Sequence, residues 1–329
     1  MGRGTAARWR RRWPGVRRGA SALLIAGALV VPLSAAARPG TPAPAPAGLA
    51  APTAATLERT YAAHRANAAE ASRMAAGHGD RRRAAADRAL AAPSRHLLAF
   101  DGRGAGLATE VLGDLARADR VAVLVPGADT GLDSYGRFHD AALALHRRLA
   151  ADAPDGVRTA VVAWLGYETP GTVSAAVATT GRADEAAPAL RALVGTLRGV
   201  TRPGTPIALL CHSYGSVVCG RAAPGLDVGD IVLLGSPGTG ADTAAGLGGR
   251  ARVWAARSSG DWTRHVPHTR AALFGATVGF GADPVSPGFG ARVFDAGHGG
   301  HGDYFAPGSR SLAGLARITL GTFPEVPDA

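Results

Sequence analysis

The sequence predicts an α/β protein in which a mostly parallel central sheet is covered by helices on both faces. Short apolar runs that end in turn residues, such as HLLAF (96–100) and VAVLVPG (121–127), are typical of buried strands. Between such runs lie segments with apolar residues at helical spacing, as in 132–151. Regular alternation of the two patterns indicates a parallel sheet, because each connecting helix packs back onto a face of the sheet.

The composition supports a folded protein and gives no sign of a nucleic-acid partner. Of the 329 residues, 47% are hydrophobic and 19% are charged, which suits a real core. The formal charge of +11 is concentrated at the N-terminus, where seven of the 36 basic residues fall within the first 18 positions. The rest of the chain holds 29 basic and 25 acidic residues without a basic stripe, so we expect no nucleic-acid binding.

Residues 1–37 have the pattern of a signal peptide. A basic start is followed by an uncharged stretch, 19–37, that ends in small residues with an Ala-x-Ala site at Ala35 and Ala37. We therefore expect an exported protein, secreted or associated with the cell envelope. The alternative is an uncleaved N-terminal anchor with the domain outside, which would be the chain's one attachment to a membrane. Residues 38–55 are rich in Pro and Ala and predict an extended, poorly folded linker.

The remaining chain divides into a helical segment, 56–95, and a main domain, 96–325. The helical segment predicts two helices separated at Gly77 and Gly79, packed against the main domain rather than folding alone. The main domain continues with predicted strands and helices in alternation. Further strands are expected at 157–167, 206–213, 230–238, 251–261 and 291–297, and helices at 132–151, 186–200, 214–223 and 311–321. Residues 168–186 fit neither pattern and suggest an insertion over the active face.

The stretch LLCHSYGSVVCG (209–220) places Ser213 where a buried strand turns directly into a helix. A serine on such a turn projects its hydroxyl from the carboxyl edge of the sheet, with free N–H groups of the helix behind it. The positions two before and two after the serine must be small, and Cys211 and Gly215 meet this condition. The pattern is a relaxed G-x-S-x-G, which predicts a nucleophilic serine.

A nucleophilic serine needs a base and an acid, and candidates follow later strands. Asp261 follows the strand ARVWAA, with Asp283 as the alternative acid, and His298 and His301 follow the strand ARVFDAG. These positions lie at the carboxyl ends of strands, on the same edge as Ser213, in the order serine, acid, histidine.

An oxyanion hole is also expected at this edge of the sheet. It would take one backbone N–H from Tyr214 and the other from Ala128 or Gly127, which follow the strand at 121–126.

The two cysteines, Cys211 and Cys219, are predicted to be buried and unpaired. One ends a strand and the other lies two turns into a helix, whereas a disulfide needs Cα atoms within about 7 Å. A disulfide, which export would permit, is the less favoured alternative.

From 56 to 321 the chain resembles the α/β-hydrolases, and specifically an actinobacterial family of this fold known as a domain of unknown function. The stretches that carry the resemblance are HGDRRRAAADRAL, HLLAFD, DRVAVLVPGADTGLDSY, VVAWLGYETP, CHSYGSVVCGRAA, IVLLGSPG and GHGDYFAPGSRSLAGLA. The resemblance implies an α/β-hydrolase fold and a serine-hydrolase site with Ser213 as nucleophile. The chain departs from the usual pattern at Cys211, where glycine is usual, and in the context SSGDW around Asp261.

Between the two histidines, we predict that His301 is the base. Gly300 and Gly302 allow its loop to fold back towards Ser213, and the resemblance matches His301 within GHGDYF. The predicted activity is hydrolysis of a small or lipid-like carboxylic ester, or less favourably an amide, through an acyl-serine and without a cofactor.

Two other classes of protein remain as alternatives. A metal-dependent hydrolase could use His298, His301 and Asp303 as ligands. A binding protein could have kept the fold and lost the activity.

Overall fold

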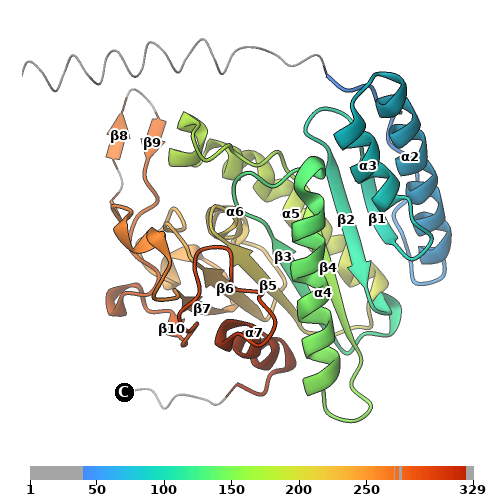
Figure 1. Cartoon of the computed structure of the whole chain (residues 1–329). Helices are drawn as coiled ribbons and strands as arrows, with labels where there is room; N and C mark the ends of the chain where they lie inside the picture. The colour runs from blue at the N-terminus through green and yellow to red at the C-terminus, as the bar shows by residue number, and fades with distance from the viewer. Residues whose placement is uncertain (1–39, 270, 274–275, 324–329) are drawn as a thin grey trace, which may run out of the picture. The chain divides into compact units, whose positions relative to one another are not determined.

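The computed structural model describes residues 40–269, 271–273 and 276–323, and its main feature is one sheet of eight strands in the order β1-β2-β4-β3-β5-β6-β7-β10 (Figure 1). The strands are β1 (His96–Asp101), β2 (Leu107–Leu112), β3 (Arg120–Val125), β4 (Thr159–Leu165), β5 (Ile207–His212), β6 (Asp230–Leu234), β7 (Arg252–Ala256) and β10 (Arg292–Val293). The strands from β4 to β10 in this order run parallel, while β2 is antiparallel to both β1 and β4. The predicted mostly parallel sheet is confirmed.

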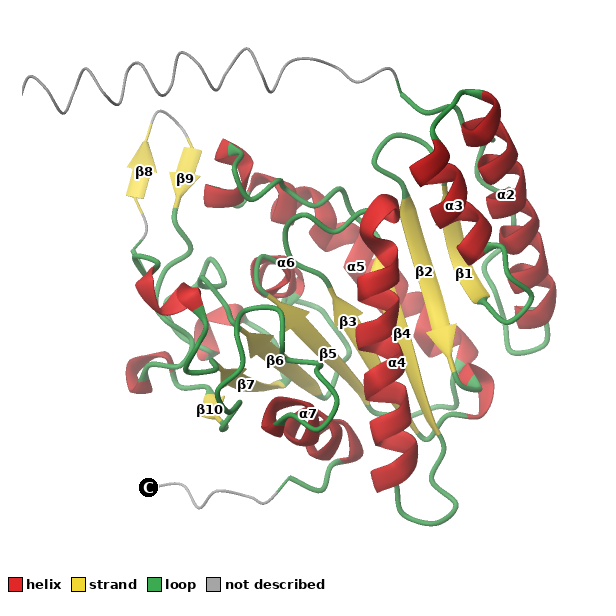
Figure 2. Cartoon of the chain, in the orientation of Figure 1, coloured by secondary structure: helices red, strands yellow, loops and turns green. Residues whose placement is uncertain are grey.

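Helices cover both faces of the sheet (Figure 2). On one face lie α4 (Tyr135–Asp152) and α7 (Arg310–Leu320), and on the other lie α5 (Gly181–Val200) and α6 (Gly215–Ala222). Side chains alternate between the faces along each strand. In β3, Val121 and Val123 join the core under α5 and α6, whereas Ala122 and Leu124 join the core under α4 and α7.

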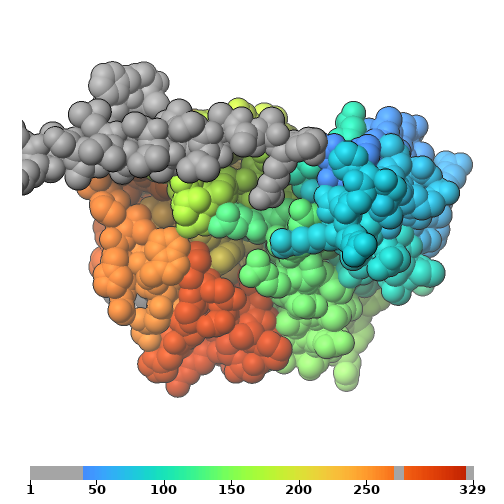
Figure 3. Space-filling model, turned by 45° about the horizontal axis from the view of Figure 1, so that its top comes forward, coloured from blue at the N-terminus to red at the C-terminus, as the bar shows by residue number. Residues whose placement is uncertain are grey.

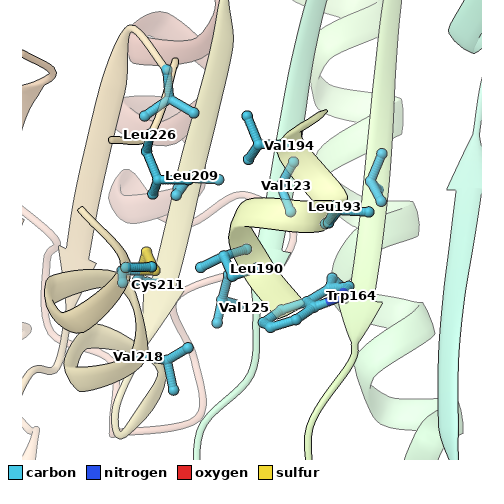
Figure 4. Packing of buried hydrophobic residues seen from close by; sticks show 14 of the residues in the cluster. Val123, Val125, Trp164, Leu190, Leu193, Val194, Leu209, Cys211, Val218 and Leu226 are labelled. Carbon is cyan, nitrogen blue, oxygen red and sulfur yellow. A yellow bond between two sulfur atoms is a disulfide. The ribbon is translucent and has the colours of Figure 1, made fainter. Parts of the chain in front are cut away.

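The core under α5 and α6 is closely packed around the middle of the sheet. Leu190, Leu193 and Val194 of α5 lie against Val123 of β3 and Trp164 of β4 (Figure 4). Strands buried on both faces read as nearly continuous apolar runs, which is why their positions could be predicted. This rigid centre fixes the strand ends at which the candidate site is built.

The segment before the sheet packs on its antiparallel edge. Helices α2 (Leu57–Gly77) and α3 (Arg81–Leu90) form a small core with β1 and β2 through side chains that include Ala68, Ala71, Leu90 and Phe100. The Pro/Ala-rich stretch before α2 is extended, and it is held to the helices by hydrogen bonds from Thr41 Oγ1 to Asp80 (2.6 Å) and from the Asn67 amide to the Ala45 carbonyl (2.8 Å).

The predicted signal peptide, 1–37, lies outside the described residues. Among the residues that the structure describes, no helix has the length and apolar character to cross a bilayer.

Four elements differ from the prediction. Strand β2 was not expected, helix α5 begins five residues before the predicted start at 186, and β8 (Ala271–Leu273) pairs with β9 (Ala276–Val278) in a separate hairpin.

Strand β2 was not predicted because the charged residue Glu110 interrupts the apolar pattern of its sequence. In the fold Glu110 is buried against Arg95 (2.6 Å) and His139 (3.0 Å). A buried charge requires such partners, and they lie 15 and 29 residues away in the chain.

The prediction of unpaired cysteines is wrong, because Cys211 and Cys219 form a disulfide with a Cα–Cα distance of 6.4 Å (Figure 4). The turn at Ser213 reverses the chain, so that α6 packs on the face of the sheet towards which Cys211 points. Eight residues of separation therefore place the two Cα atoms within the reach of a disulfide. The sulfur of Cys211 is directed under α6, which explains how a residue larger than glycine fits before the serine.

Loss of this disulfide should lower stability measurably. A cross-link that closes a loop of this length restricts the unfolded chain and contributes about 2–3 kcal/mol to the free energy of unfolding. We therefore expect the double variant Cys211→Ala/Cys219→Ala to unfold at lower guanidinium concentration than the oxidised protein. Reductant should shift the wild-type midpoint in the same direction and leave the variant unchanged. An unaltered wild-type midpoint after verified reduction would contradict the expectation.

A second stability prediction concerns Asp87 on α3. Its side chain is fully buried, and neither carboxylate oxygen has a hydrogen-bond partner among the described residues. Burial raises the pKa of Asp87 to about 7, against the pull of nearby Arg83. Since the folded pKa exceeds the unfolded one, the folded state binds the proton more tightly. The resulting stability is present below the unfolded pKa and is lost as the pH rises towards 7.

The variant Asp87→Asn removes this titration. It should therefore be more stable than the wild type at pH 8, by on the order of 2 kcal/mol, and should lose that advantage near pH 4. Urea unfolding of both proteins at the two pH values tests this. An equal difference at both pH values would show that Asp87 does not titrate in this range.

Candidate active site

Ser213 lies on a sharp turn between β5 and α6 at the carboxyl edge of the sheet. Its backbone has φ +54°, in the left-handed region that non-glycine residues seldom adopt. Two glycines make the turn possible. A Cβ on Gly215 would lie 2.5 Å from the carbonyl oxygen of Val125, and a Cβ on Gly127 would lie 2.6 Å from Cβ of Ser213. The strained turn and its close neighbours aim the serine hydroxyl into a cavity above the sheet.

The structure brings Ser213, His301 and Asp261 together in one hydrogen-bonded chain. The Ser213 hydroxyl donates to Nε2 of His301 (2.9 Å), and Nδ1–H of His301 donates to the two oxygens of Asp261 (2.9 and 3.0 Å). The side chain of His301 is 18% exposed and that of Asp261 is fully buried. A hydroxyl, a base and a buried carboxylate in this sequence can remove the proton of the hydroxyl and stabilise the cation that results.

Asp261 sits in a shell of hydrogen-bond donors. The Tyr304 hydroxyl donates to one oxygen (2.5 Å), and the backbone N–H and the hydroxyl of Thr263 both donate to the other (2.8 Å each). Burial alone would raise the pKa of Asp261, but the hydrogen bonds from His301, Tyr304 and Thr263 outweigh burial and lower the pKa well below its usual value. Gly235 provides the space, since a Cβ there would lie 2.4 Å from a carboxylate oxygen of Asp261. The carboxylate is therefore held ionised and in one orientation.

The two backbone positions expected for an oxyanion hole are next to the serine hydroxyl. Tyr214 directly follows Ser213, and Gly127 and Ala128 line the same cavity as Ser213. Across the described part of the chain, the N–H groups of Tyr214 and Ala128 donate no hydrogen bond. The Tyr167 hydroxyl donates to the Pro126 carbonyl (2.6 Å) and so fixes the start of the loop that carries Ala128. Free amides on fixed backbone are what oxyanion binding requires.

The segment between β4 and α5 lies over this loop, as the sequence suggested for residues 168–186. Asp129, with φ +57°, accepts hydrogen bonds from the backbone N–H (3.1 Å) and the hydroxyl of Thr172. The Thr169 hydroxyl donates to the Thr130 carbonyl (2.8 Å), and the Tyr214 hydroxyl donates to the Thr179 carbonyl (2.8 Å). One wall of the cavity is thus tied both to the loop that carries Ala128 and to the turn at Ser213.

His212 holds the loop of His301 by a hydrogen bond to its backbone. Its Nε2–H donates to the backbone carbonyl of His301 (2.7 Å), and the two rings lie 4.7 Å apart. Burial, with the nearby His301, lowers the pKa of His212 to about 4, so that this ring is neutral at neutral pH. A neutral His212 ring adds no positive charge beside the imidazole of His301.

The cavity above Ser213 has a volume of about 570 Å³. Trp262 stands at its edge, half exposed, with its ring 4.7 Å from the ring of His301. Phe138, Val177 and Phe305 add further apolar surface to the lining. A cavity that is largely apolar, with a few convergent polar groups at one end, suits an organic substrate with one reactive polar bond.

The alternative site residues lie elsewhere. His298 Nδ1 lies 2.8 Å from the Ser259 hydroxyl rather than near Ser213, and Asp303 accepts from the Gly300 N–H (2.7 Å) in its own loop. Asp283, the alternative acid, pairs with Arg257. His298, His301 and Asp303 therefore do not gather into one ligand set. Within 40–269, 271–273 and 276–323, no group of three or more His, Cys, Asp or Glu residues is placed to hold a metal ion.

Comparison with known proteins places the chain in a family. Residues 101–271, just over half of the sequence, match the sequence model of a family described as alpha/beta hydrolase. The chain belongs to this alpha/beta hydrolase family. An uncharacterized protein of Mycobacterium tuberculosis is 34% identical to the chain over 253 residues, which cover 68% of this chain and 38% of the relative. A second uncharacterized protein, from Mycobacterium bovis, is 32% identical over 149 residues, which cover 43% of this chain and 56% of the relative. The chain thus spans about two fifths of the length of the first of these relatives.

Solved structures align with the chain at low sequence identity. A serine hydrolase without a lid from Xanthomonas campestris aligns with a TM-score of 0.43 and 16% identity, over 72% of this chain and 98% of that chain. The esterase LipW from Mycobacterium marinum aligns with a TM-score of 0.42 and 17% identity, over 77% of this chain and 89% of that chain. The match to the family model confirms the predicted α/β-hydrolase fold and family resemblance.

Sequence reasoning missed the residues that support the predicted triad. Tyr304 and Thr263 hold Asp261, and His212 holds the backbone of His301. Their place in the sequence could have pointed to them, since all three lie within three residues of a predicted triad member. Their hydrogen-bond partners depend on how the loops fold, and no short sequence pattern specifies that.

Proposed function

We propose that this protein is an exported serine esterase that cleaves a carboxylic ester through an acyl-serine intermediate. The observation that carries the proposal is the hydrogen-bonded chain from Ser213 through His301 to Asp261 at the end of an apolar cavity. The family supports hydrolysis in general, and this arrangement favours attack by serine. The substrate would be a small or lipid-like ester, with amides less favoured.

In the proposed reaction, the Ser213 hydroxyl oxygen attacks the ester carbonyl carbon while its proton passes to Nε2 of His301. The imidazolium that forms is stabilised by the ionised Asp261. The N–H groups of Tyr214 and Ala128 would hold the oxyanion, with Gly127 as the alternative to Ala128. As the C–O bond to the alcohol breaks, His301 returns its proton to the departing oxygen. Water, activated by the same histidine, then releases the acid and restores Ser213.

A fluorophosphonate label together with aryl esters tests this reaction class. The wild type should take the label and hydrolyse a short-chain aryl ester, and Ser213→Ala should do neither. Labelling of a correctly folded Ser213→Ala variant would show that another residue is the nucleophile. Failure of the wild type to react with the label and with every ester would favour the inactive binding protein.

Export is supported by the signal-like residues 1–37 and by the buried disulfide next to the serine. Disulfides persist in oxidising compartments outside the cytosol. Cleavage after Ala37 would leave the Pro/Ala-rich stretch at the new N-terminus. N-terminal sequencing of the protein recovered from the culture medium tests this. A Met1 or Gly2 start in the membrane fraction would favour the anchor.

A further inference from the structure

A second cavity, of about 640 Å³, adjoins the one above Ser213. Four residues line both cavities: Arg137 and Ala141 of α4, and Gly302 and Phe305 of the segment after His301. Figure 3 shows green α4 and the red C-terminal segment side by side on the same face of the molecule. The boundary between the cavities therefore lies beside the base of the proposed triad.

The α4 side of this second cavity is a row of alanines bordered by charged side chains. Residues 137, 141, 144, 148 and 151 follow one another at intervals of four and three, so they share one face of the helix, and Asp140, Leu143 and Arg147 add to the lining beside them. Three of them are alanines, Ala141, Ala144 and Ala151, whose methyl groups leave the space beside the helix open. At the rise of an α-helix the stretch from residue 137 to residue 151 is about 21 Å long.

The opposite side is apolar. It is formed by Phe305, Ala306 and Pro307 and by Leu312 in the first turn of α7. Arg148 on the α4 side pairs with Asp152 one turn further along the helix (2.7 Å), which leaves its hydrocarbon stem as the part that can cover apolar surface. Apolar side chains therefore line both the cavity above Ser213 and the one beside it.

We propose that the two cavities form a single groove that binds a long aliphatic chain of the ester substrate along α4. This inference rests on the proposed function and adds the substrate class to it. A fatty acyl chain of a membrane lipid spans about half of the ~30 Å hydrocarbon core of a bilayer, so this stretch of α4 is long enough to hold one. Each methylene group that leaves water on binding should raise kcat/KM roughly threefold to fourfold until the groove is filled.

Blocking the groove at two distances from Ser213 tests the inference. Aryl esters from acetate to palmitate are assayed below their micellar concentrations with the wild type, Ala144→Trp and Ala151→Trp. Ala150→Trp is the matched control, because Ala150 is an exposed alanine of the same helix that lines neither cavity. In the wild type, kcat/KM should rise with chain length. Ala144→Trp should lose roughly tenfold or more with palmitate and stay within about twofold with butyrate.

The position of the block adds a second criterion. Ala151→Trp should reduce kcat/KM only for the longest chains, because residue 151 lies further from the serine, and Ala150→Trp should follow the wild type. A wild-type profile that is flat or falls from butyrate to palmitate would overturn the inference while leaving the proposed esterase intact. So would identical profiles for Ala144→Trp and Ala150→Trp.

Palmitate binding separates failure of the groove from failure of the proposed function. Calorimetry on Ser213→Ala should show binding of palmitate, and adding Ala144→Trp to that variant should weaken the binding roughly tenfold. Binding without any ester turnover by the wild type would support the groove and overturn the esterase. Absence of binding, or equal binding after Ala144→Trp and Ala150→Trp, would overturn the groove.

Discussion

Replacement of His301 by alanine is expected to lower kcat by about three to six orders of magnitude, whereas His298→Ala should change it by less than about tenfold. The reason is the position of each imidazole relative to the Ser213 hydroxyl. His301 Nε2 lies 2.9 Å from the Ser213 hydroxyl, while His298 lies 2.8 Å from the hydroxyl of Ser259. Without His301 no described side chain is placed to take the proton of Ser213, and a neutral serine hydroxyl is a poor nucleophile.

The comparison of the two histidines is internally controlled. Both lie in the loop between β10 and α7, so a general disturbance of this loop would affect both variants. Circular dichroism and the unfolding midpoint establish that each variant is folded before its rate with a short aryl ester is measured. The opposite ranking in folded variants would transfer the role of base to His298. Equal large losses would indicate that the loop as a whole, and not the imidazole at 301, supports activity.

Much of the fold and of the proposed triad could be predicted because both follow from strand ends. Buried parallel strands are continuous apolar runs, and their carboxyl ends lie at one edge of the sheet. Ser213 and Asp261 follow such runs in β5 and β7, and His301 follows the short, exposed edge strand β10, so their meeting required only the strand order and the order of residues along the chain. The glycines on either side of His301 then favoured it over His298.

What could not be predicted depends on contacts between distant parts of the chain. Strand β2 contains Glu110, a charged residue that is not expected in a buried strand. Its burial depends on Arg95 and His139, which pair with its carboxylate in the fold. The disulfide depends on how the chain reverses at Ser213. The number of residues between Cys211 and Cys219 does not specify the distance between their Cα atoms after this turn. The groove along α4 could not be foreseen either, because its second side comes from residues more than 150 positions later.

Asp261→Asn should produce the second large loss of activity, a fall in kcat of about 10³- to 10⁴-fold with little change in structure. Every partner of the Asp261 carboxylate is a donor: Nδ1–H of His301, the Tyr304 hydroxyl, and the N–H and hydroxyl of Thr263. An asparagine has one acceptor oxygen and one NH₂ group, so its NH₂ group must face a position that now receives a hydrogen bond. The two donors of Thr263 hold the amide oxygen on their side, which places the NH₂ group where the second carboxylate oxygen now lies, against Tyr304 and 3.0 Å from Nδ1 of His301.

This orientation predicts which step fails. The tyrosine hydroxyl can accept a hydrogen bond as well as donate one, but Nδ1 of His301 can accept only after it loses its proton. The proton of the neutral ring then lies on Nε2, which can no longer take the proton of Ser213, so kcat should fall while KM for a short ester changes little.

The variant Tyr304→Phe removes one donor and leaves the carboxylate in place, so its loss of activity should be smaller, roughly tenfold. Rates and folding of both variants are compared with the wild type. If Tyr304→Phe costs as much as Asp261→Asn, or if Asp261→Asn keeps more than about a tenth of wild-type turnover, Asp261 does not set the protonation of His301.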